Sequence, residues 1–140
     1  MELKRGDIIH SRSICEIDHG KFFVILNICD ETVAGFFFIN SVVNKFIKDK
    51  QEQLELQYPI RPCDYHFLTH DSFICGSNLI EVSVALLYSQ FEKGIAKKVG
   101  MLHQIDMDNL MNSCRKSKIY SIRTKKCYFY DKSLDNKHHK

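Results

Sequence analysis

Two dense apolar runs dominate the first third of the chain. Residues 21–28 and 32–39 are rich in Phe, Val and Ile, and the acidic pair Asp30-Glu31 lies between them. Two such runs joined by a short polar turn are typical of a β-hairpin. Further short apolar runs predict additional strands at 6–9, 54–58, 65–68 and 72–75.

Later in the chain the apolar pattern changes to a helical period. Residues 105–118 carry an apolar stripe at intervals of three and four residues, formed by Met107, Leu110, Met111 and Cys114. Asp106 is suited to cap the first turn, because its carboxylate can accept hydrogen bonds from free amides. We interpret the methionines as core packing. Residues 119–130 are strand-like, and the polar residues 131–140 predict a flexible tail.

Many short strands followed by a late helix predict a β-rich α+β fold. We expect a small β-barrel or sandwich of five or more mostly antiparallel strands with the helix packed on it. The predicted domain is residues 1–130, with residues 131–140 as the tail. Both faces of the Phe22-Phe23 and Phe36-Phe37-Phe38 runs are apolar. One face should pack on something else, so we expect a covered sheet or a homodimer.

Composition narrows the class of protein. The chain has 140 residues, of which 44% are hydrophobic and 26% charged, as in a single globular domain. No apolar run reaches the roughly 20 residues of a membrane-spanning helix, and the first residues form no apolar signal core. The sequence therefore predicts a cytoplasmic protein that does not enter a membrane.

The cysteines and histidines show no spacing that is typical of a metal site. The six cysteines are spread along the chain without a CxxC pair, so we expect reduced, mostly buried thiols. No Cys/His cluster has the spacing of a zinc finger. The sequence predicts neither a metal ion nor another cofactor.

Positive charge is concentrated near the end of the chain. The net charge of +3 permits nucleic-acid binding without requiring it. Residues 115–126 carry no acidic side chain and six basic ones: Arg115, Lys116, Lys118, Arg123, Lys125 and Lys126. This stretch is either a solvated helix end with a charged edge strand, or a patch that contacts phosphates.

A second group of candidate residues surrounds the polar loop before the first long apolar run. Arg12 lies within this loop, His10 and His19 flank it, and Lys21 follows it. The imidazoles of His10 and His19 can transfer protons near neutral pH, and the positive charges of Arg12 and Lys21 can bind a phosphate. The alternative is that each is an ordinary solvated loop residue.

Five segments in this order resemble the MazF/PemK family of growth-inhibiting toxins. They are Lys4-Arg5-Gly6-Asp7-Ile8-Ile9, residues 20–26, residues 35–41, residues 67–74, and residues 96–102 with the helix that follows. The resemblance covers roughly residues 3–120. It implies an SH3-like barrel, a homodimer, metal-independent cleavage of single-stranded RNA, and an antitoxin protein that occupies the same groove.

The resemblance also points to particular site residues. The family commonly has an Arg followed by Pro at the start of the second strand, where this chain has Lys21 and Phe22, and a Thr or Ser at the end of the third, where Asn40 and Ser41 stand. Lys lacks the planar fork that Arg offers a phosphate. The predicted catalytic residues are Lys21, His19, Arg12, Ser41 and Asn40. The alternative is an inactive barrel that acts as a protein-interaction or regulatory module.

Overall fold

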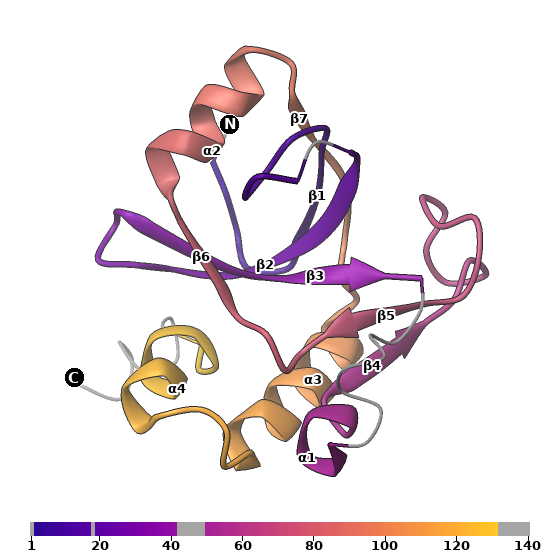
Figure 1. The fold of residues 1–140 in the computed structure, drawn as a ribbon, viewed down its shortest axis with the longest axis vertical. Coiled ribbons are helices and arrows are strands. Elements are labelled where there is room, and N and C mark those ends of the chain that lie inside the picture. Colours follow the sequence, from indigo (N-terminus) through magenta and orange to yellow (C-terminus); the bar gives the residue numbers. More distant parts are fainter. Residues whose placement is uncertain (1, 18, 42–49, 132–140) are drawn as a thin grey trace.

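The computed structural model describes residues 2–17, 19–41 and 50–131. The strands are β1 (Asp7–Ser11), β2 (Lys21–Cys29), β3 (Val33–Asn40), β4 (Gln57–Ile60), β5 (Ser72–Cys75), β6 (Ile80–Ser83) and β7 (Ala96–Met101). The helices are α1 (Gln51–Leu54), α2 (Val84–Glu92), α3 (Gln104–Lys116) and α4 (Ile122–Tyr128). Every strand pairing within these ranges is antiparallel, and the fold is mixed α+β (Figure 1).

The hairpin of β2 and β3 is the centre of the sheet. Asp30 and Glu31, in the turn between the strands, have φ values of 52° and 62°. The Thr32 amide donates to the Cys29 carbonyl at 3.2 Å across this turn. Consecutive residues with positive φ are typical of the tight turns that match the twist of a hairpin. The predicted hairpin and its acidic turn are therefore confirmed.

The outer edge of β3 is divided between two strands. β6 pairs with the first half of β3, from Val33 to Phe36, and β5 pairs with Ile39 and Asn40. The order across the sheet is β4-β5-β3-β2-β1-β7, with β6 beside β3. β4 and β7 thus lie at its two ends, and in the described ranges the sheet is open. The predicted set of five or more antiparallel strands is confirmed in this coarser form.

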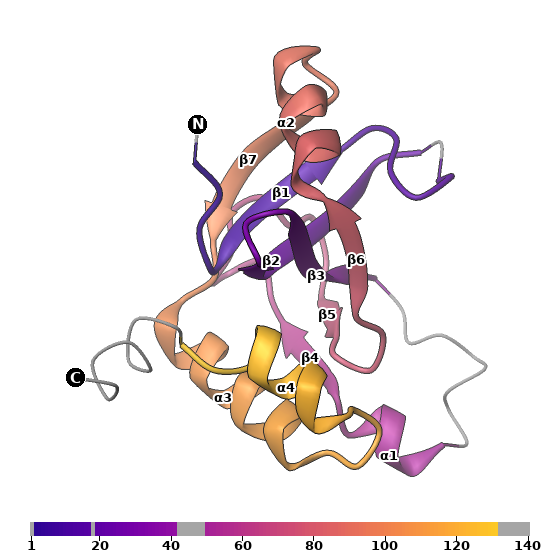
Figure 2. The same cartoon turned by 90° about the vertical axis from the view of Figure 1, so that its left-hand side faces the viewer.

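Helices cover both faces of the hairpin. Alternation along the strands directs Phe23 and Phe36 toward α2, in a core that includes Leu87. It directs Leu26 and Phe37 toward α3 and α4. α2 lies on one side of the sheet and α3 with α4 on the other (Figure 2). The expected covered sheet is formed within the chain itself.

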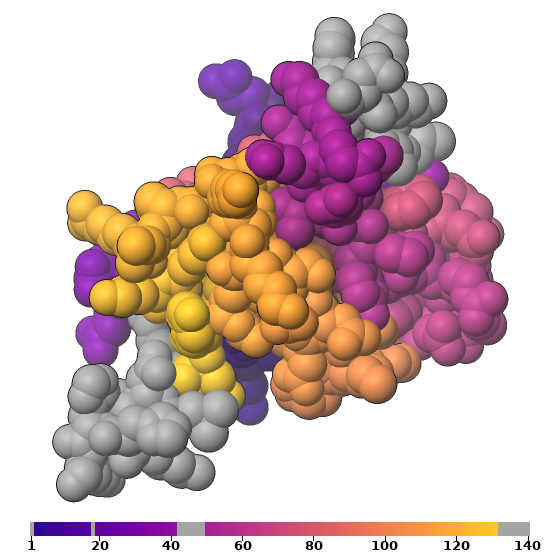
Figure 3. All heavy atoms as spheres, turned by 90° about the horizontal axis from the view of Figure 1, so that it is seen from below, coloured from indigo at the N-terminus to yellow at the C-terminus, as the bar shows by residue number. Residues whose placement is uncertain are grey.

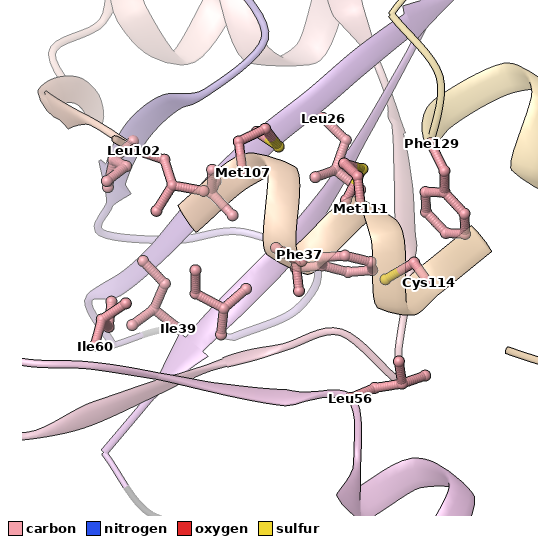
Figure 4. Close-up of a cluster of buried hydrophobic side chains, with 14 of the residues drawn as sticks. Leu26, Phe37, Ile39, Leu56, Ile60, Leu102, Met107, Met111, Cys114 and Phe129 are labelled. Atoms are coloured by element: carbon pink, nitrogen blue, oxygen red, sulfur yellow. The ribbon is translucent and has the colours of Figure 1, made fainter. Parts of the chain in front are cut away.

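The predicted late helix is present, and its apolar stripe is buried. α3 turns Met107, Leu110, Met111 and Cys114 into the core, where they meet Phe37 and its neighbours (Figure 4). Asp106 is not its cap: His103 holds that position, without a side-chain hydrogen bond to the helix. The prediction of an aspartate cap was therefore wrong.

Residues 119–130 contain a helix, α4, where a strand was predicted. The Ser121 hydroxyl accepts a hydrogen bond from the Thr124 amide at 3.1 Å and caps the first turn. At the other end the Arg115 guanidinium donates to the Phe129 carbonyl at 2.6 Å, and Arg5 donates to the Tyr128 carbonyl at 3.1 Å. These partners satisfy carbonyls that a helix end leaves open. The tail at 132–140 lies outside the described residues.

Residues 65–68 form turns rather than the predicted strand. The Tyr65 amide donates to the Arg61 carbonyl at 3.1 Å, and the Leu68 amide donates to the Tyr65 carbonyl at 3.0 Å. The Asp106 carboxylate accepts hydrogen bonds from the Tyr65 hydroxyl and, at 2.6 Å, from the Tyr58 hydroxyl. Asp106 therefore fastens this turn region and β4 to the first turn of α3.

A methyl group at Gly35 should displace α4. A Cβ at this position of β3 would lie 2.5 Å from the Tyr128 ring, which is itself buried. We expect Gly35→Ala to lower the free energy of unfolding by roughly 1–3 kcal/mol, as overpacking does in cores. Gly100→Ala is the matched control in β7, where the nearest atom would be 3.7 Å away. Equal urea unfolding midpoints for the two variants would contradict the packing of α4 on β3.

Stability should fall in alkali because of the buried tyrosines. Burial first, and then the bond to Asp106, raise the pKa of Tyr65 above its ordinary range. Since the unfolded tyrosine loses its proton first, the stabilisation is complete below the ordinary pKa of about 10 and decreases as pH rises beyond it. Urea midpoints measured across this range should fall less steeply for Tyr65→Phe than for the parent protein. If the urea midpoints of the two proteins fell equally with pH, Tyr65 would not contribute to the loss of stability in alkali.

Candidate functional site

A cavity lies at the end of the β2–β3 hairpin opposite its turn. Its volume is about 550 Å³. The apolar part of its wall consists of Phe22, Ile39, Phe67 and Leu68. The polar part includes His19, Lys21, Asn40, Ser41, Thr69, His70 and Ser72. We call this space the hairpin-end cavity.

Two strand pairings bring the cavity residues together. Phe22 lies opposite Ile39 in the hairpin, so Lys21 lies beside Asn40 at the strand ends. β5 continues the sheet at the same point, with Phe73 opposite Asn40. The connection between β4 and β5 therefore lies beside the end of β3, on the opposite side of the molecule from α4 (Figure 1).

Lys21 supplies a positive charge to this cavity. Its ammonium donates a hydrogen bond to the Asn40 side-chain oxygen and lies 5.1 Å from the centre of the Phe38 ring. Burial lowers the pKa of Lys21, an effect that the Cys75 thiol partly opposes. Lys21 takes no part in the ion pairs found among the described residues. An incoming anion would therefore meet a cation that is already partly dehydrated and held in position.

Two histidines line the same cavity. His19 comes from the loop before β2, and His70 from the connection before β5. Thr69 Oγ1 and His70 Nδ1 are 3.0 Å apart, and the Ser72 hydroxyl donates to the His70 carbonyl at 3.0 Å. The Thr69 contact orients the His70 imidazole, and the Ser72 hydrogen bond holds the His70 backbone. A pair of imidazoles beside an ammonium can perform acid and base chemistry near neutral pH.

His10 lies behind the wall of the cavity. Its ring is 4.7 Å from the Phe22 ring, and a Cβ at Gly20 would lie 2.5 Å from its Nε2. Burial, and then the charge of Lys97, lower the pKa of His10. Gly20 therefore allows the chain to pass close to this ring, and His10 supports Phe22 from behind.

Arg12 does not join the predicted catalytic group. Its guanidinium donates to the Gly94 carbonyl at 3.3 Å, in the connection between α2 and β7. The Arg12 amide also donates to the Ile95 carbonyl, which directs this loop toward α2. Of the predicted catalytic residues, His19, Lys21, Asn40 and Ser41 line the cavity, and Arg12 lies elsewhere.

The predicted basic patch lies at the other end of the hairpin. Arg115 binds the Phe129 carbonyl and lies 5.2 Å from the Tyr130 ring, so it is engaged within the fold. Figure 3 shows the surface formed by α3 and α4, which carry most of the basic stretch. Arg123 and Lys126 line a shallow hollow beside Cys29, the last residue of β2. Lys21 and Cys29 are the two end residues of β2. Because a strand rises about 3.3 Å per residue, the hollow lies roughly 25 Å from Lys21.

Sequence reasoning missed the contribution of residues 67–72. Phe67, Thr69 and His70 lie in a segment that was predicted to be two short strands around a polar break. The break itself was the only local signal, because a loop between strands often carries functional residues. Its proximity to Lys21 depends on the pairing of β5 with β3, which local pattern does not reveal.

Comparisons with known proteins do not assign the chain to a family. No protein-family model matches it, and no curated protein matches it. Within residues 2–17, 19–41 and 50–131, no helix is long and apolar enough to cross a membrane. The same residues contain no group of three or more His, Cys, Asp or Glu side chains that could hold a metal ion. The geometry of the hairpin-end cavity is therefore the basis for a functional proposal.

Proposed function

We propose that the hairpin-end cavity binds single-stranded RNA and cleaves it without a metal ion. The observation that carries the proposal is that two imidazoles, His19 and His70, and one partly buried ammonium, Lys21, line a single cavity. Attack of a ribose 2′-OH on the adjacent phosphate needs a base, an acid and a cation. These three side chains supply that set.

In this reaction one imidazole accepts the 2′-OH proton as the oxygen attacks phosphorus. The other imidazole donates a proton to the departing 5′ oxygen. The products are a 2′,3′-cyclic phosphate and a 5′-hydroxyl group. Lys21 balances the negative charge that develops on the phosphoryl oxygens, and Asn40 holds its ammonium through a hydrogen bond.

The apolar wall favours an unpaired base as the bound group. The Phe22 and Phe67 rings are 5.0 Å apart and tilted by 44°, and both are only partly buried. Aromatic side chains bind single strands by stacking with exposed bases. A paired base in an A-form duplex cannot reach such a wall without leaving its stack. Single-stranded RNA is therefore the preferred substrate.

The proposal includes a relationship to the MazF/PemK toxins. Lys21 and Ser41 stand at the two strand ends where that family carries its Arg and its Thr or Ser, and both line the cavity. On this proposal the open sheet is a variant of the SH3-like barrel, and the chain acts in the cytoplasm as a homodimer. An antitoxin protein would act by covering the hairpin-end cavity.

The cleavage reaction can be tested with a labelled single strand in excess EDTA. We expect products that end in a 2′,3′-cyclic phosphate and a bell-shaped dependence of the rate on pH. His19→Ala and His70→Ala should each reduce the rate by roughly 10²–10⁴-fold, as the loss of an acid or base does. Lys21→Ala should reduce it by roughly 10²–10³-fold.

Two variants serve as controls for this experiment. His66→Ala removes a neighbouring imidazole that does not line the cavity, and Arg12→Ala removes the cation bound to Gly94. Both variants should retain the rate of the parent protein within about twofold, because neither side chain lines the cavity and an exposed substitution of this kind has little effect on folding stability. Absence of turnover in the parent protein would instead support a catalytically inactive barrel that acts as a protein-interaction or regulatory module.

The salt dependence of binding should separate the cavity from the basic patch. Affinity for RNA should fall steeply as salt rises, because each neutralised phosphate releases counterions. Lys21→Ala should weaken binding of both a trinucleotide and a long single strand. Replacing Arg123 and Lys125 by Ala should weaken only the long strand, which alone can span roughly 25 Å along the hairpin. No affinity at low ionic strength would refute the RNA proposal.

A further inference from the structure

Two cysteines lie in contact where α4 meets the end of β2. Cys29 is the last residue of β2, and Cys127 lies in the last turn of α4. Their sulfur atoms are 2.9 Å apart, although 98 positions separate them in the sequence. A disulfide bond has a length of about 2.05 Å, so closure requires an approach of about 0.9 Å.

The packing of α4 holds this pair in place. The neighbouring Tyr128 lies against Gly35 and donates to the Glu81 carboxylate at 2.6 Å. The Asn27 side chain donates to the carbonyl of Cys127 itself at 3.3 Å. The sulfur contact therefore joins two elements that are held together by the buried Tyr128 ring and by the hydrogen bond from Asn27.

Both sulfurs can be reached by a small solute. Cys29 and Cys127 are half-buried, and they line an open hollow of about 450 Å³. A thiol must be accessible to react with an oxidant. The open hollow gives the Cys29 and Cys127 thiols this access.

The remaining cysteines differ from this pair. Cys15 and Cys63 are exposed, and the Cys75 thiol lies 3.7 Å from the Ser77 hydroxyl. Cys114 is buried in the core, and burial raises its pKa to about 12. Of the cysteines in the described ranges, Cys29 and Cys127 bring their sulfur atoms to within 2.9 Å of each other.

We propose that Cys29 and Cys127 form a reversible disulfide when the protein meets a small peroxide. One thiolate attacks a peroxide oxygen, the O–O bond breaks, and a sulfenic acid and water are formed. The second thiolate attacks the sulfenic sulfur, the S–S bond forms, and hydroxide leaves as water after protonation. Two thiols and one hydrogen peroxide thus give one disulfide and two water molecules, and a dithiol reductant reverses the change.

The bond would act on α4 and not on the hairpin-end cavity. It would tie α4 to the hairpin and close a long loop of the unfolded chain, which stabilises the folded state. Lys21 lies at the opposite end of β2. Oxidation should therefore change thermal stability while leaving affinity for the trinucleotide unchanged, because that short strand tests the hairpin-end cavity and not α4. This outcome separates the disulfide proposal from the one on RNA.

The test uses the whole purified chain, treated with hydrogen peroxide and then alkylated to block the remaining thiols. Peptide mapping by mass spectrometry should find Cys29 linked to Cys127 with the loss of two hydrogens. The unfolding temperature should rise by roughly 5–15 °C and return after dithiothreitol treatment. Cys29→Ser and Cys127→Ser should each abolish the linked peptide and the temperature shift.

Cys75→Ser is the matched control, because it replaces a half-buried thiol that lies beside a hydroxyl. It should keep both the linked peptide and the reversible shift. Recovery of Cys29 and Cys127 as separately alkylated peptides, while Cys15 or Cys63 is oxidised, would overturn the proposal. So would a linked peptide that forms equally well in urea, where the folded contact is lost.

Discussion

Phe23 and Phe36 pack on one face of the central hairpin while Phe37 packs on the other, and all three side chains are fully buried. Burial of one such side chain contributes roughly 1.5–3 kcal/mol. A strand pair that is apolar on both faces needs cover from both sides, so α2 must reach one face and α3 with α4 the other. The path of the chain after β5 follows from this requirement.

Much of the fold could be predicted because its signals are local. The hairpin follows from two apolar runs around Asp30-Glu31, and the buried face of α3 follows from the spacing of residues 107–114. The segment at 119–130 could not be assigned in this way. Its helix is settled by the cap at Ser121 and by Arg5 and Arg115, which come from distant positions and satisfy its carbonyl end.

The part of the candidate site that could be predicted is the part that the register of the β2–β3 hairpin determines. Lys21 and Asn40 must be neighbours once the two apolar runs pair. His70 reaches the same cavity only through the pairing of β5 with β3, and no periodicity in the sequence indicates that pairing. The prediction that Arg12 belongs to the site was wrong, because nearness in sequence does not ensure nearness in the fold. Arg12 is near Lys21 in sequence, but its loop turns toward Gly94 instead.

Both ends of the open sheet are poor templates for another strand. Pro59, in β4, has no backbone amide to donate. β7 carries exposed Lys97 and Lys98, and its pairing with β1 contains an irregularity in register beside Ile8. Charged side chains, proline and bulges of this kind oppose edge-to-edge association and aggregation. Pro59 and the lysines of β7 therefore oppose continuation of the sheet from β4 or β7 into a second copy of the chain.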